Sequence, residues 1–111
     1  MKRSEAIRLY KLEYLPSAQR DMVEIVRYIA RDLGNPQAAL RLSDEFDAAV
    51  NILSEYPYAC PPYHPIRLLS HEYRKLIVRN YIMLYWVSEE TRTVTIMRVV
   101  YAPSDYERLL T

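Results

Sequence analysis

The feature that most constrains the fold is an apolar run, Tyr81–Val87, that contains no charged residue. So short an apolar run is typical of a strand that is buried on both faces of a sheet. It is flanked by residues 73–78 and 94–101, in which apolar and polar side chains alternate as in half-buried strands. Arg79-Asn80 and residues 88–93 leave room only for hairpin turns. The sequence therefore predicts three antiparallel strands, with residues 81–87 in the centre.

Two amphipathic helices are predicted ahead of these strands, after a first strand at residues 7–15. The apolar stripe of the first helix, which opens at Pro16-Ser17, consists of Ala18, Met22, Ile25, Val26, Ile29 and Leu33. Gly34, the only glycine, suits the left-handed residue that ends a helix, and Asn35-Pro36 suits the start of the next one. The stripe of the second helix, which ends before Pro57, consists of Ala39, Leu42, Phe46, Ala49, Val50 and Leu53. So tight a connection makes the two helices an antiparallel hairpin.

The predicted order of elements is β-α-α-β-β-β. This order gives an α+β fold in which a helical hairpin packs on one face of an antiparallel-rich sheet. The chain has 111 residues, and we expect a single domain over residues 1–111, because a chain of this length rarely buries two independent cores.

The composition limits which sites the chain can carry. Cys60 is the only cysteine and the only histidines are His64 and His71, so we predict no disulfide, no metal site and no cofactor. No long uncharged apolar stretch and no signal-peptide core occur, so we predict a cytoplasmic protein without a membrane partner. The net charge is only +1, so an RNA target would have to be bound through a local basic patch or within a larger assembly.

Tyrosine is unusually frequent, with 11 residues against one Trp and one Phe. Its flat apolar ring and polar hydroxyl suit base stacking and protein interfaces. They also suit half-buried strands, and strand packing is expected to account for most of these tyrosines.

Segments spread over nearly the whole chain match a known pattern. Residues 73–81 read Tyr-Arg-Lys-Leu-Ile-Val-Arg-Asn-Tyr, and residues 94–101 are followed by Asp105-Tyr106. Near the start, Pro16-Ser17-Ala18 and residues 35–39 fit the same pattern. Together these segments resemble the RelE/ParE superfamily of bacterial toxins. The resemblance implies the toxin of a type II toxin–antitoxin pair, neutralised in a hetero-oligomer by a cognate antitoxin protein.

The resemblance leaves the cellular target open, because some family members cut messenger RNA on the ribosome and others inhibit DNA gyrase. Fold alone does not choose between these activities. We expect growth inhibition by ribosome-dependent cleavage of mRNA. The alternatives are a ParE-like gyrase inhibitor that acts by protein–protein binding, and a weakened toxin that only binds its antitoxin.

RNA cleavage without a metal needs groups that activate the 2′-hydroxyl, neutralise the phosphorane charge and protonate the 5′-oxygen. Lys, Arg and Tyr can supply all three. By resemblance to the nuclease members, the candidate catalytic residues are Lys75, Arg79, Arg98 and Tyr106. Tyr101 and Arg74 are candidate RNA-binding residues, with Tyr101 suited to stacking on a base.

Structural interpretations of these residues stay open beside the catalytic ones. Arg98 interrupts an apolar strand, so it is either functional or paired with an acid such as Glu13 or Asp105. Lys75 fits the solvated face of an alternating strand, and Tyr106 could pin the tail to the sheet.

Two positions depart from the nuclease pattern. Ile82 follows Tyr81 where nuclease members commonly have Arg, and Pro103 lies where many members carry Arg. Neither side chain can hold a phosphate, and the loss of one transition-state donor typically lowers a rate by about 10²–10³. The two positions therefore favour a weak nuclease, a gyrase inhibitor or an inactive variant, and Pro103 is expected to lower toxicity.

Overall fold

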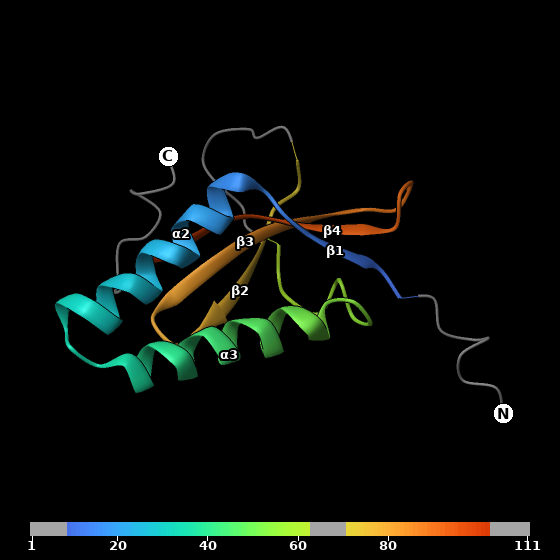
Figure 1. Ribbon diagram of the computed structural model, residues 1–111. Helices are drawn as coiled ribbons and strands as arrows, with labels where there is room; N and C mark the ends of the chain where they lie inside the picture. Colours follow the sequence, from blue (N-terminus) through green and yellow to red (C-terminus); the bar gives the residue numbers. More distant parts are fainter. Residues whose placement is uncertain (1–8, 63–70, 103–111) are drawn as a thin grey trace, which may run out of the picture.

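The computed structural model describes residues 9–62 and 71–102 of the chain (Figure 1). In chain order its elements are β1 (Lys11–Tyr14), α2 (Pro16–Arg27), a π-helical turn η1 (Tyr28–Asp32), α3 (Pro36–Ile52), β2 (Arg74–Val78), β3 (Tyr81–Ser88) and β4 (Thr93–Tyr101). This order confirms the predicted β-α-α-β-β-β arrangement. The first strand is shorter than predicted, and residues 7–8 of that prediction lie outside the described residues.

The sheet has the strand order β1-β4-β3-β2. β3 pairs antiparallel with β2 and with β4, whereas β1 pairs parallel with β4. The sheet is thus mostly antiparallel, as predicted, and β3 has a strand on each side. β1 reaches only from Thr93 to Ile96 of β4, so within residues 9–62 and 71–102 no strand neighbours residues 97–101 on that side.

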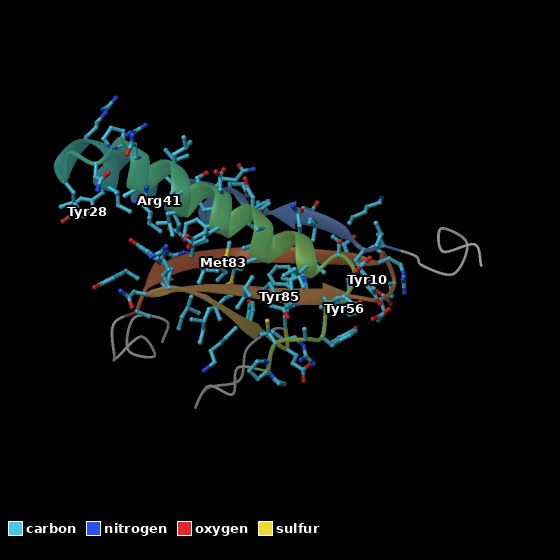
Figure 2. All side chains as sticks on the ribbon, turned by 90° about the horizontal axis from the view of Figure 1, so that it is seen from below. Tyr10, Tyr28, Arg41, Tyr56, Met83 and Tyr85 are labelled. Carbon is cyan, nitrogen blue, oxygen red and sulfur yellow. The ribbon has the colours of Figure 1, made fainter. Side chains whose placement is uncertain are left out.

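The main core lies between the helical hairpin and one face of the sheet. Phe46 and Val50 of α3 and Ala18 of α2 pack there against Met83 and Tyr85 of β3. Figure 2 shows Met83 and Tyr85 beneath α3. The Tyr85 hydroxyl is satisfied inside this core because it donates to the Pro57 carbonyl oxygen at 2.8 Å. Burial, and next the contact with Cys60, raise the pKa of Tyr85.

A second apolar cluster lies on the face of the sheet that is turned away from the helices. Ile82 and Leu84 of β3 are buried there with Tyr73, and Trp86 and Val100 pack against them. Because Met83 and Tyr85 are buried on the helical face, β3 is buried on both faces. This confirms the prediction made from the apolar run.

The turn between the helices follows the sequence prediction at its centre. Gly34 has a φ of 64°, in the left-handed region, and the Asn35 side chain accepts a hydrogen bond from the Ala38 N–H at 3.1 Å. Before the turn, however, η1 is wider than an α-helix, because the Leu33 N–H bonds to the Tyr28 carbonyl. The wider turn rotates Leu33 away from the core, and 59% of Leu33 is exposed rather than buried with the stripe as predicted.

Within residues 9–62 and 71–102, no helix has both the length and the apolar character that a membrane crossing requires.

The buried hydroxyl of Tyr85 gives a test of this core. Tyr85→Phe leaves the Pro57 carbonyl without its donor, and we expect it to lower the free energy of unfolding by about 1–2 kcal/mol. Urea unfolding followed by circular dichroism measures the change. The matched control is Tyr56→Phe, at an exposed tyrosine just before the same loop, and its effect should stay within about 0.5 kcal/mol. Equal losses in both variants would contradict a structural role for the Tyr85 bond.

Candidate functional site

Arg79, a candidate catalytic residue, is held by an acid on α3. It occupies the turn between β2 and β3 with a φ of 56°, where an L side chain is rare. Its Nε and Nη2 donate to the two carboxylate oxygens of Glu45 at 2.5 and 2.7 Å. This bidentate pair raises the pKa of Arg79 and lowers that of Glu45. The guanidinium is therefore engaged on the helical side of the sheet.

Arg98, the candidate on β4, is paired with Asp21 of α2. Its Nε donates to Asp21 Oδ2 at 2.6 Å and its Nη2 to Asp21 Oδ1 at 3.2 Å. The bonds to Asp21 raise the pKa of Arg98. The expected partner Glu13 instead accepts a bond from Thr95 Oγ1 at 3.4 Å, and Asp105 lies outside the described residues. The paired interpretation of Arg98 thus holds, but with a different acid.

Asp21 is also part of the sheet edge, which sequence reasoning missed. Past the end of β1, α2 runs beside β4 and satisfies its backbone in place of a strand. The Leu15 N–H and the Ser17 hydroxyl donate to the carbonyls of Ile96 and Met97 at 2.9 and 2.7 Å. One turn further on, Asp21 Oδ2 accepts the Val99 N–H at 2.8 Å. The only sequence signal was Arg98 itself, because a cation in an apolar strand calls for a nearby carboxylate.

Arg74 is engaged at the other edge of the sheet. It donates to the Cys60 carbonyl at 2.7 Å, pairs with Glu72 at 3.3 Å and lies 4.9 Å from the centre of the Tyr58 ring. Lys75, its neighbour on β2, is half-buried and pairs with Leu84 of β3, so it belongs to the face turned away from the helices.

The remaining candidates are Tyr101 and Tyr106. Tyr101, at the end of β4, is 53% exposed and packs edge-on against Tyr81, with 5.5 Å between the ring centres. Tyr106 and Pro103 lie outside the described residues. The candidate catalytic side chains that are described thus occupy three places: the β2–β3 turn, the outer edge of β4 and the opposite face of the sheet. The structure does not gather them around one phosphate.

An apolar groove lies between α2 with η1 and the unpaired part of β4. Its volume is about 1100 Å³. Its apolar walls include Ile25, Tyr28, Ile29, Leu33, Tyr81, Val99 and Tyr101. Beside it, a smaller hollow of about 200 Å³ is lined by Arg41 and Arg79. Figure 2 shows Tyr28 and Arg41 near the end of the hairpin where α2 and α3 are joined. Exposed tyrosine and arginine around an apolar floor are typical of protein interfaces.

At the opposite end of the molecule, Tyr10 and Tyr58 share one carboxylate. Tyr10 donates to the Glu89 carboxylate at 2.8 Å, and Tyr58 donates to the same carboxylate. Its hydrogen bond to Glu89 raises the pKa of Tyr58 to about 12 and helps to lower that of Glu89. Arg92 lies over the Tyr10 ring at 4.0 Å. This network ties the loop after α3 to the β3–β4 hairpin, which is a structural use of tyrosine.

Comparisons with known proteins point to one family. The family model of the ParE toxin of the type II toxin–antitoxin system, parDE, matches residues 12–106. The toxin–antitoxin complex RelBE2 from Mycobacterium tuberculosis has a TM-score of 0.58 and 21% identity, covering 86% of this chain and 94% of that one. The chromosomal ParDE system from P. aeruginosa has a TM-score of 0.66 and 16% identity, covering 85% and 97%. No curated protein sequence matches the chain. The family match confirms the resemblance seen in the sequence, and the two structures share its fold.

The bridge made by Asp21 can be tested by mutation. Asp21→Ala leaves the Val99 N–H and the Arg98 guanidinium without their acceptor, and we expect a loss of about 1–3 kcal/mol in the free energy of unfolding. Asp21→Asn keeps an acceptor for Val99 and should lose less. Glu24→Ala, an exposed acid on the same helix, is the control and should change stability little. Urea unfolding of the three variants ranks them, and an Asp21→Ala effect as small as that of Glu24→Ala would contradict the bridge.

Proposed function

The chain belongs to the ParE toxin family of type II toxin–antitoxin systems, and from that premise we propose that it inhibits growth by binding DNA gyrase. Gyrase inhibition is the protein-binding alternative left open by the sequence, and it replaces mRNA cleavage as the preferred activity. Gyrase acts on DNA in the bacterial cytoplasm, so the proposal places the chain there too.

The observation that carries the proposal is the engagement of the arginines. A nuclease without a metal needs several cationic donors directed at one phosphate. These donors must already be in place before the reaction begins. Arg79 and Arg98 instead each hold a carboxylate in a bidentate pair, on different elements. A phosphate would have to displace both acids, which costs two charge-assisted hydrogen bonds at each site.

The surface chemistry supports protein binding. The exposed side chains around the groove, Tyr28, Leu33 and Tyr101, are of the kind that anchors protein interfaces. The face of the sheet that carries Lys75 is centred on apolar residues, with Ile82 and Leu84 buried beside Tyr73. Such a face offers a phosphate backbone few donors.

We further propose that a cognate antitoxin neutralises the chain by occupying this groove. Antitoxin segments that fold on binding lay apolar side chains into a groove or add a strand to a free edge. The groove offers both, because its apolar wall adjoins the part of β4 that has no neighbouring strand among the residues that the structure describes. The two solved structures that share the fold come from a toxin–antitoxin complex and a toxin–antitoxin system.

Two assays on the purified chain test the activity. We expect inhibition of DNA supercoiling by gyrase and no A-site cleavage of mRNA in primer extension on programmed ribosomes. Lys75→Ala should leave supercoiling inhibition unchanged, because that residue has no part in the proposed mechanism. Cleaved mRNA with normal supercoiling would replace this proposal with the nuclease activity. An effect in neither assay would leave a weakened toxin that only binds its antitoxin.

A second test concerns the antitoxin and uses co-expression with the neighbouring gene. Leu33→Asp places a charge on the groove wall and should abolish co-purification of the gene product, while the wild-type chain retains it. The matched control is Ile77→Asp, which changes a similarly exposed apolar residue on β2, away from the groove. Co-purification that survives Leu33→Asp, or that is lost in both variants, would contradict the groove as the antitoxin site.

A further inference from the structure

The outer side of the helical hairpin carries a second apolar depression. It has a volume of about 510 Å³, and its lining comes from Met22, Val23, Val26, Arg27, Ala30, Arg31 and Ser43. Val23, one of these residues, is 51% exposed. On α3, Leu40 and Asp47 share the face of Ser43 at the i, i+3 and i+7 spacing, and Leu40 is 66% exposed. We call this surface the outer valley. It lies on the opposite side of α2 from the groove.

The charges that border the outer valley are segregated by helix. Arg27 and Arg31 line it from α2 and η1, whereas the exposed acids Asp44 and Asp47 belong to α3. None of these four forms an ion pair with another residue in the part of the chain that the structure describes. On the valley side, α2 and η1 therefore present the positive charges of Arg27 and Arg31, and α3 presents the negative charges of Asp44 and Asp47. Such a surface is complementary to a copy of itself.

The arrangement of the charges selects one two-fold axis. The helices are antiparallel, and Ser43 lines the valley with Val26, Arg27 and Ala30, so these residues lie at the same level along the hairpin. A two-fold axis parallel to the helices places α2 of one copy over α3 of the other at that level. Arg27 then meets Asp44 of the second copy, and symmetry forms the contact twice. An axis perpendicular to the helices would instead place Arg27 and Arg31 over the same arginines.

We propose that the outer valley is a homodimer interface, with α2 of each copy packed across α3 of the other and Arg27 paired with Asp44. The interface is small and its charges lie at the rim, so the dimer is weak and depends on ionic strength. The proposal is independent of gyrase binding, because dimerisation is measured as mass and not as activity.

Sedimentation equilibrium of the purified full chain over a range of concentrations tests the dimer. We expect the mass to rise toward twice that of the monomer at low salt, and the dimer to weaken as salt is added. Arg27→Asp and Asp44→Arg should each raise the dissociation constant about tenfold, through two symmetric repulsions. The double variant carrying both reversals should restore dimerisation, because it exchanges the charges without changing their pairing.

The control is Arg41→Asp, the same charge reversal at an α3 residue that lines the smaller hollow and not the outer valley, and it should leave the dissociation constant unchanged. Circular dichroism establishes that each variant is folded. A wild-type chain that stays monomeric at every concentration would overturn the proposal, as would a dimer unaffected by Val23→Asp. Single reversals that weaken the dimer without rescue in the double variant would overturn the Arg27–Asp44 pairing. Loss of antitoxin co-purification in Arg27→Asp but not in Leu33→Asp would assign the valley to the antitoxin instead.

Discussion

The architecture depends on one carboxylate, that of Asp21, which joins α2 to the edge of β4. A single oxygen, Oδ2, accepts both the Val99 N–H and the Arg98 guanidinium. Because β1 stops opposite Ile96, the following residues of β4 would otherwise form an open sheet edge, which invites pairing with other chains. α2 covers the first part of that edge with side chains rather than with a strand. Leu15, Ser17 and Asp21 are the residues that bond to the β4 backbone. The groove begins beyond Asp21, where α2 continues beside β4.

The bonds of the other arginines support the proposal that the chain acts by protein binding. Arg79 fastens the β2–β3 turn to α3, Arg98 fastens β4 to α2, and Arg74 fastens β2 to the loop at Cys60. Each guanidinium has the planar fork that suits a carboxylate or a phosphate equally well. In this chain the ligands are three carboxylates and one backbone carbonyl, so the arginines connect elements of the fold. Each of these arginines therefore has a structural contact in the folded chain.

The sequence predicted the elements well, because each depends on local patterning. The alternation around β2 and β4 and the unbroken apolar run of β3 place these strands within about one residue of their observed ends. The partner of Arg98 could not be predicted, since Asp21 is 77 positions away and its approach depends on where β1 stops. The π-helical turn was missed for another reason. Hydrophobic spacing alone does not reveal a single wider turn, so Leu33 was assigned to the core.

The short helix α2 contributes residues to three different surfaces. Ala18 and Met22 face the core, Asp21 and Ile25 face β4 and the groove, and Val23 is exposed on the outer valley. The groove and the outer valley lie on opposite sides of this helix, so a partner in one does not cover the other. A dimer formed through the valleys would leave both grooves open. Self-association and neutralisation by an antitoxin are thus compatible, and each dimer would present two antitoxin sites whose spacing is fixed by the hairpin.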